Sequence, residues 1–386
     1  MILNRSLRFA ASDGLPSSEL PCGWVPRVGS VGGFRWWVVP EHTSGPHRVD
    51  RSRGPQSYHR NMVSSVSEES VEAVVRGLVG AVNVDGGPTD RQLSVLRSIT
   101  THLWNRPDLD PANLSGISPQ ETAEQVTDPH ERRCFHEVLI ALEVCRHPLT
   151  LAQVESVESY SAALEFDGPD LEIFRDLVDK GAASAAKDYS RFLAGNLKQR
   201  SEPSLVAQGS YSSATESGAE PELLKRFEAF ADLDPDSLGR AYVDFHRRNR
   251  IPLPGEQASS MNHFYVAHDM THVIAGIEPT GPGEVALSGF QWAMNDNEVN
   301  SAALLASLVV HEAGFGQAGT LTTETGQLGM TGAAELLGQE MSRGSRCTAD
   351  FSLVDHFALA AEPLAEVRKS FGVQPPDDPL DGHHNW

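Results

Sequence analysis

The chain has 386 residues and a mass of 41.9 kDa, which exceeds one ordinary domain and predicts two domains with tails. Its 31 Lys and Arg stand against 52 Asp and Glu, and the resulting charge of −21 opposes binding to nucleic acid and to anionic membrane surfaces. Hydrophobic residues make up 40% and charged residues 22%, which is typical of a globular chain with a real core and excludes a disordered or collagen-like one.

Neither the apolar runs nor the cysteines indicate export or membrane insertion. The longest apolar run, 302–310, is about half of the roughly 18 residues that a membrane-spanning helix needs. Four cysteines show no CxxC spacing, and the first residues, MILNRSLRFAASDG, lack the apolar stretch of a signal peptide. We therefore expect a reduced, cytoplasmic protein with at most peripheral membrane contact.

Residues 1–61 differ in composition from the rest of the chain. They carry eight arginines, four acids and no lysine, so this segment is net +4, and Gly, Pro and Ser occur throughout it. Such a segment cannot bury enough apolar area to offset its ordering entropy. We expect a poorly ordered extension, or else a natural translation start at Met62.

A regular helical pattern begins after Met62. In SEESVEAVVRGLVGAV the apolar residues recur at spacings of three and four, with Ser67 as the expected N-cap. Similar patterns cover 90–103, 128–145, 150–164 and 170–197. These patterns predict a bundle of five helices over residues 62–198 that folds alone. Residues 199–220 are rich in Ser, Gly and Ala, which predicts a flexible linker.

A second helical domain is predicted for residues 221–372. Its helices are expected over 221–231, 238–248, 264–276, 283–294, 302–315 and 350–372. The fold class is therefore all-α, with two helical bundle domains and poorly ordered tails at both ends. The Pro-, Asp- and His-rich tail 373–386 is expected to be loose, so that truncation after Val373 leaves any bound metal in place.

The strongest chemical motif lies in this second domain. His268 and His272 are four residues apart on an expected helix, so they share a face, and Asp269 is about 100° away. Glu284 follows His272 after eleven residues and belongs to the first turn of the next helix, beyond the turn 279–283. Two imidazoles and two carboxylates are ligands for a divalent metal. The alternative is a surface helix whose His and Asp are solvated or cap a helix end.

The charge distribution favours the metal interpretation. No Lys or Arg occurs between Arg250 and Arg343, whereas ten acids do. A cation would reduce the repulsion among these acids. The alternative is that the segment only shares the acidity of the whole chain.

The sequences LGRAYVDFHRRN (238–249) and HFYVAHDMTHVIAGIEPTGPGEVALSGFQWAM (263–294) resemble the Coq-four family of ubiquinone (coenzyme Q) biosynthesis proteins. The hallmark of that family, His-Asp-X-X-His-X(11)-Glu, matches His268, Asp269, His272 and Glu284 at its full spacing, and the resemblance covers about residues 221–372. It implies an all-helical fold and a divalent ion at these four residues, usually taken as zinc. The resemblance further implies a reaction in which a prenylated aromatic acid loses its C1 carboxylate and gains a hydroxyl group at that position. It also implies that the protein organises other quinone-biosynthesis proteins.

The nature of the metal and of the bound molecule stays open at this level. Zn²⁺ would act as a Lewis acid, whereas Fe²⁺ or Mn²⁺ would be needed for oxygen chemistry at the metal. Where the resemblance implies basic residues before the motif, the chain has Asn-His-Phe-Tyr at 262–265. Candidate substrate contacts are Tyr265, Arg247, Arg248 and His311. The alternative function is a non-catalytic protein that binds a quinone precursor or another isoprenoid lipid and whose metal is structural.

The first domain shows a fainter similarity to the TerB-like helical domains of tellurite-resistance proteins, over about residues 64–198. The turn Val-Asp-Gly-Gly-Pro-Thr at 84–89 fits the acidic turns of that family, but its counterpart at 145–150 lacks acidic residues. The similarity implies a helical interaction or regulatory module.

Overall fold

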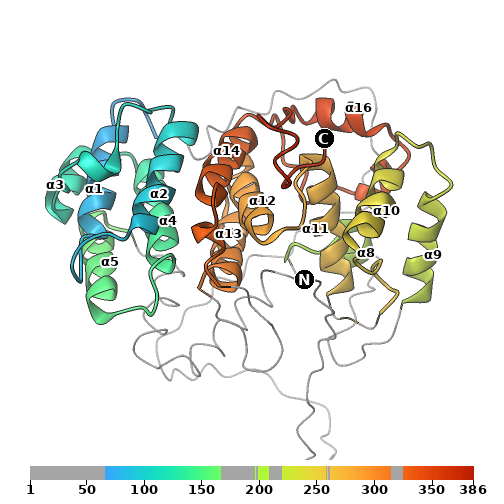
Figure 1. Cartoon of the computed structure of the whole chain (residues 1–386), viewed down its shortest axis with the longest axis horizontal. Coiled ribbons are helices and arrows are strands. Elements are labelled where there is room, and N and C mark those ends of the chain that lie inside the picture. Colours follow the sequence, from blue (N-terminus) through green and yellow to red (C-terminus); the bar gives the residue numbers. More distant parts are fainter. Residues whose placement is uncertain are drawn as a thin grey trace, which may run out of the picture. The chain divides into compact units, whose positions relative to one another are not determined.

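The computed structural model describes residues 66–166, 196, 199–207, 220–257, 259, 261–313 and 325–386 (Figure 1). The chain divides into the units Met1–Arg60 and Asn61–Trp386, and every described residue belongs to the second unit. The predictions for residues 1–61 and, apart from residue 196, for the helix over 170–197 lie outside the described residues. The described part is helical and contains no strand, which confirms the predicted all-α class.

Five α-helices lie within the described residues 66–166. They are α1 (Val71–Ala81), α2 (Asp90–Ser98), α3 (Pro119–Gln125), α4 (Pro129–Val144) and α5 (Leu151–Ala163). A π-helical turn, η1 (Ile99–Leu103), continues α2, and Thr89, Ser118 and Thr150 close capping boxes at the helix starts. The sequence pattern missed α3 because this short helix buries only Thr122 and has no apolar face.

One buried carboxylate organises two of these caps. Glu143 is fully buried, and its Oε2 accepts hydrogen bonds from the side-chain amides of Gln92 (3.3 Å) and Gln153 (2.5 Å). The oxygen of each glutamine accepts from the backbone N–H of its N-cap, Thr89 or Thr150. The turns that precede α2 and α5 therefore meet. Burial raises the pKa of Glu143 to about 7.

The helices described after residue 199 form the second part of the unit. They are α8 (Pro203–Ala207), α9 (Pro221–Phe230), α10 (Leu238–Asn249), α11 (Asn262–Ala275), α12 (Gly281–Met294), α13 (Glu298–His311), α14 (Ala333–Ser345), α15 (His356–Leu359) and α16 (Leu364–Ser370). The single helix expected over 350–372 is thus two short ones. Among the described residues, no helix has the length and apolar character needed to cross a membrane.

Helix α14 was not predicted, because Gly338 and Gly344 weaken its helical pattern. Both glycines allow close packing. A Cβ on Gly338 would lie 2.2 Å from Ser98 Oγ, and a Cβ on Gly344 would lie 2.1 Å from the carbonyl oxygen of Phe290. Helix α14 can therefore approach α2 and α12 closely only because these positions are glycine, a residue that disfavours an isolated helix.

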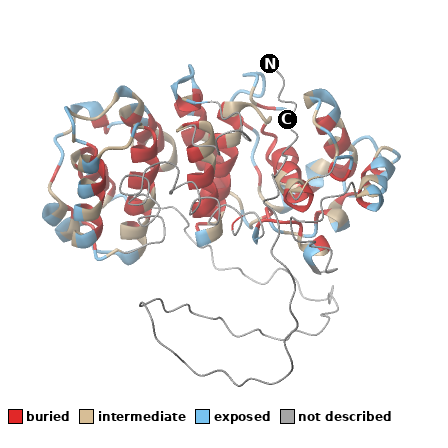
Figure 2. Cartoon of the chain, turned by 90° about the horizontal axis from the view of Figure 1, so that it is seen from below, coloured by how far each residue is buried: buried red, intermediate tan, exposed pale blue. Residues whose placement is uncertain are grey.

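Buried side chains form two clusters. Figure 2 colours the buried residues red along the helices. The first joins α1, α2, α4 and α5 to apolar residues of α12, α13 and α14, among them Trp292, Leu304 and Leu337. The second joins α9, α10 and α11 to other residues of α12, among them Leu287 and Phe290. Residues of both predicted domains thus share one core cluster. Independent folding of 62–198 is what the sequence pattern predicts, and the behaviour of that fragment tests it.

Part of the predicted linker belongs to the fold. Arg200, Ser201 and Glu202 are buried, and α8 follows them. The carboxylate of Glu202 lies 2.7 Å from Nδ1 of the buried His356. The expectation of a flexible segment is therefore wrong for residues 199–207, where long-range contacts compensate for the missing apolar periodicity. Residues 208–219 lie outside the described part.

The tail 373–386 is not loose as expected. His383 O accepts from the backbone N–H of Glu278 (2.7 Å), and the N–H of Asn385 donates to Gly276 O (2.9 Å). Trp386 packs against Gly276, and the guanidinium carbon of Arg368 lies 3.8 Å from the centre of the Trp386 ring. These contacts hold the loop between α11 and α12.

Candidate metal centre

Helices α11 and α12 carry the predicted ligands and are joined by a short turn (Figure 1). Helix α11 ends at Gly276, whose φ of 73° is the left-handed conformation that glycine adopts at little cost. Thr280 then caps α12 by accepting from the N–H of Gly283 at 3.1 Å. Glu284 thereby lies in the first turn of α12, as the spacing predicts.

Three of the four predicted ligands converge. Nε2 of His268 lies 3.2 Å from Glu284 Oε2, and Nε2 of His272 lies 3.5 Å from Glu284 Oε1. Ligand atoms of the three residues all lie within 4.8 Å of one another. Two ligands about 2.0–2.1 Å from a tetrahedral zinc ion are about 3.3–3.4 Å apart. The nitrogen–oxygen separations match that spacing.

Neighbouring groups orient the two imidazoles. Nδ1 of His272 donates to the carbonyl oxygen of Ile277 at 2.9 Å, which leaves Nε2 with a free lone pair. This Nε2 is buried and has no hydrogen-bond partner. Phe264 stacks on His268 and Phe245 on His272, with ring centres 5.0 and 5.5 Å apart. A buried lone pair that faces a carboxylate fits a metal ligand.

The electrostatics also suit a cation. Burial alone disfavours the charged carboxylate of Glu284, yet the two imidazoles hold its pKa well below the usual range. Burial likewise opposes protonation of His272, but the charges of Glu284 and Asp269 raise its pKa overall. Positive charge, on a ring or on an ion, is therefore stabilised here.

Asp269, the fourth predicted ligand, lies outside this group. Its Oδ2 is 3.3 Å from Nε2 of His246 on α10, and both side chains are buried. Nothing in the sequence indicates that His246 lies here, because it precedes His268 by 22 residues and belongs to another helix. His246 follows Tyr242 by four residues in LGRAYVDFHRR, so the sequence does indicate that these two side chains share one face of a helix.

Arg200 is a second residue that the sequence did not reveal. It is buried, donates to Gln291 Oε1 at 2.6 Å, and lies 5.4 Å from the ring centre of Phe264. Burial lowers its pKa to about 10, and the charge of Glu284 opposes this shift. Arg200, which belongs to the predicted linker, thus places a buried positive charge against the segment 251–342, which contains no Lys or Arg.

The predicted substrate contacts are mostly engaged within the chain. Arg247 pairs with Asp244 and Arg248 with Glu278, each at 2.6 Å. The hydroxyl of Tyr265 lies 3.7 Å from Met261 Sδ.

His311 ends α13 four residues after Ser307, whose hydroxyl donates to the backbone oxygen of Glu284 at 3.2 Å. This contact places one face of α13 beside the start of α12. Roles of Tyr265, Arg247, Arg248 and His311 in substrate binding stay predictions.

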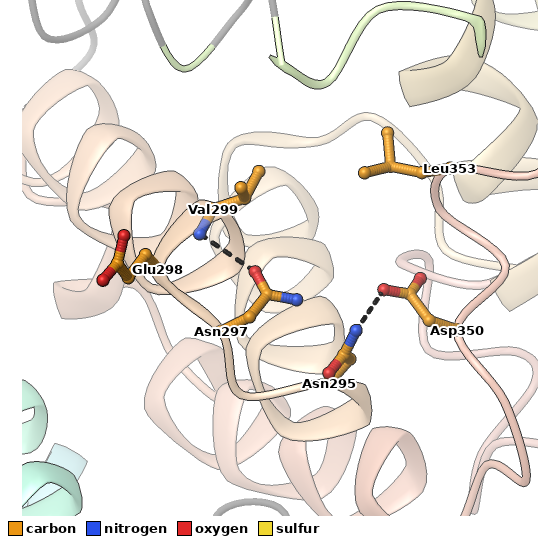
Figure 3. Close-up of a pocket in the computed structure, with 6 residues that line it drawn as sticks. All are labelled: Asn295, Asn297, Glu298, Val299, Asp350 and Leu353. Carbon is orange, nitrogen blue, oxygen red and sulfur yellow. Dashed lines mark hydrogen bonds between the residues drawn. The ribbon is translucent and has the colours of Figure 1, made fainter. Parts of the chain in front are cut away.

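Figure 3 shows a hollow at the other end of α12. It is lined by Asn295, Asn297, Glu298, Val299, Asp350 and Leu353. Asn295 donates to Asp350 at 2.8 Å, and the N–H of Val299 donates to Asn297 at 2.9 Å. Asn295 follows Glu284 by eleven residues, about 16 Å along a helix. The hollow is therefore separate from the three converging ligands.

Comparison with protein-family models finds no match, and comparison with curated proteins finds none either. A solved structure of a candidate ubiquinone biosynthesis protein from Nostoc punctiforme is similar over 62% of this chain and 98% of that chain. The identity is 14% and the TM-score 0.29. At these values the similarity assigns neither family nor function to this chain.

Proposed function

We propose that this protein binds a divalent metal ion through His268, His272 and Glu284 and acts on the head group of a ubiquinone-type precursor. The observation that carries the proposal is the convergence of two imidazoles and one carboxylate from α11 and α12 within 4.8 Å. The match to His-Asp-X-X-His-X(11)-Glu connects this centre with quinone biosynthesis. Asp269 as a further ligand stays a prediction.

The three residues suit Zn²⁺, and the nitrogen and oxygen ligands also accept Fe²⁺ or Mn²⁺. Two neutral imidazoles and one carboxylate leave one positive charge on a divalent ion. When bound, such an ion supplies Lewis-acid stabilisation to an anionic carboxylate or phenolate of the substrate. The side chain of Glu284 is 23% exposed, so the centre is accessible from one side.

The proposed reaction removes the C1 carboxylate of a prenylated aromatic acid as CO₂ and places a hydroxyl group at C1. This is a net two-electron oxidation, so the reaction also consumes an oxidant such as dioxygen. In this chain, the Ile277 carbonyl fixes the tautomer of His272, and Phe264 and Phe245 fix both rings. The chain thus keeps both Nε2 atoms directed at one point.

A non-catalytic alternative has its own supporting observation. The three ligands tie α11 to α12, so the same ion would fasten two helices of a protein that binds prenyl lipids or organises partner enzymes. Both hypotheses predict bound metal. Only the first predicts turnover.

The experiment combines metal analysis with an assay on the full chain. We expect about one equivalent of metal to be lost in His272→Ala and the affinity to fall at least tenfold in Glu284→Gln, which keeps the size but removes the charge. His311→Ala is the control and should retain its metal. Mass spectrometry of a prenylated 4-hydroxybenzoate incubated with protein and dioxygen tests turnover.

Full metal content in both His272→Ala and Glu284→Gln would exclude this centre. Metal without any product would favour the structural alternative.

A further inference from the structure

Two arginines are buried among the described residues, and only one of them is paired with an acid. Arg343 forms an ion pair with the buried Glu340 and donates to two backbone carbonyl oxygens. Arg200 is 8% exposed, yet its guanidinium has one hydrogen-bond partner in the described part, the neutral Oε1 of Gln291 at 2.6 Å. Buried charges are normally paired with an opposite charge. Arg200 therefore lacks an anionic partner.

Arg200 contacts both helices that carry the metal ligands. Its guanidinium carbon lies 5.4 Å from the ring centre of Phe264, which precedes His268 by one turn on α11. Its partner Gln291 follows Glu284 by seven residues on α12, which is about two turns, or roughly 10 Å, along the same face of the helix. Arg200 thus lies on the faces of α11 and α12 that carry the candidate centre, within about two helical turns of it.

We propose that Arg200 binds the carboxylate of the aromatic acid on which this protein acts, so that the phenol oxygen at the other end of the ring faces the metal. This inference rests on the proposed function and adds the orientation of the substrate in the same site. A spacing of roughly 10 Å suits an aromatic ring with oxygen at both ends, together with its contacts to the ion and the guanidinium. A guanidinium also donates two parallel hydrogen bonds to a carboxylate.

The surroundings of Arg200 suit a planar anion. The ring of Phe264 lies 5.0 Å from that of His268 as well as beside Arg200, so it offers an apolar face to an aromatic ring between them. Burial lowers the pKa of Arg200 only to about 10, so the guanidinium keeps its charge at neutral pH. The side chain of Glu284 is 23% exposed, which opens the site at its metal end.

The test compares two ligands that differ only in the carboxylate, a geranylated 4-hydroxybenzoate and the corresponding geranylated phenol. Calorimetric titration of the metal-loaded full chain measures both dissociation constants. We expect Arg200→Gln to weaken binding of the acid about 10–100-fold, the range for a hydrogen bond to a charged group, and to leave binding of the phenol unchanged. Arg200→Lys should bind the acid with intermediate affinity, because lysine keeps the charge but not the planar pair of donors.

Arg226→Gln is the matched control. Arg226 also lies over an aromatic ring, with its guanidinium carbon 3.5 Å from the ring centre of Phe357, but on helices that carry no metal ligand. Its loss should change neither affinity. Metal content and melting temperature are measured for every variant, and Arg200→Gln should hold as much metal as the wild type.

Unchanged binding of the acid in Arg200→Gln, or an equal loss of acid and phenol, would overturn the inference. If Arg200→Gln does not fold, Arg200→Lys decides, and wild-type affinity for the acid in that variant would overturn it. A wild type that holds metal but does not bind the acid also overturns it, although the metal centre then stands. Binding of the acid that depends on Arg200 in a protein without metal would support the carboxylate site and exclude the metal centre.

Discussion

Glu137 of α4 is an acid at the contact between the two parts of the described unit. Its Oε2 accepts from the indole N–H of Trp292 on α12 at 2.9 Å. Burial and the nearby charge of Asp296 raise the pKa of Glu137 to about 8. The side chain is therefore mostly neutral at pH 7, so Trp292 donates to a protonated carboxyl group.

This raised pKa predicts a pH-dependent stability. The folded state keeps the proton that the unfolded chain releases near pH 4.5, so the contribution is complete below pH 4.5 and is lost as the pH rises to 8. Glu137→Gln imitates the neutral acid. We expect it to raise the free energy of unfolding at pH 8 by up to about 4 kcal/mol and to change it little at pH 4.5.

Urea denaturation at pH 4.5, 6.5 and 8 measures this effect. The exposed Glu155→Gln on α5 is the control and should leave the pH profile unchanged. An equal effect of Glu137→Gln at all three pH values would contradict the prediction.

At the scale of elements, residues 381–386 hold the turn that leads to Glu284. Besides the backbone bonds to Gly276 and Glu278, Nδ1 of His383 lies 2.8 Å from the hydroxyl of Thr280, the N-cap of α12. The carboxylate of Glu278 is also bound by Arg248, at 2.6 Å, and by Asn249. The turn is therefore supported from both the tail and α10.

Deletion of 381–386 should weaken metal binding about tenfold while the helical content is retained, because groups that orient ligands affect affinity at this level. The composition of the tail alone predicted no effect. Competition with a chromophoric chelator and far-UV circular dichroism measure the two quantities. Leu380→Ala, at a 90% exposed position, is the control. Unchanged affinity after deletion would show that the turn supports itself.

At the scale of the whole unit, the shared core predicts how fragments behave. Leu304, Leu305 and Leu308 of α13 and Leu337 of α14 belong to the same buried cluster as the helices α1, α2, α4 and α5. A fragment of residues 62–198 would expose the apolar area that these residues cover. The sequence pattern, by contrast, predicts that this fragment folds alone.

We expect the 62–198 fragment to bind a hydrophobic dye and to show poor NMR dispersion, and to become ordered when residues 199–386 are co-expressed. The full chain serves as the reference for both measurements. A fragment that is soluble, well dispersed and free of dye would restore the two-domain prediction.

The sequence by itself determined the helical class and the position of most helices, because periodicity and caps such as Thr89 and Thr150 act within a few residues. It also predicted that His268, His272 and Glu284 meet, since helical spacing and one short turn bring them together. Four other features depend on contacts between distant residues. They are the pairing of Asp269 with His246, the burial of Arg200, the close packing of α14 and the hydrogen bonds of the C-terminal tail. Only the tertiary structure decided them, because local pattern carries no information about which surfaces meet.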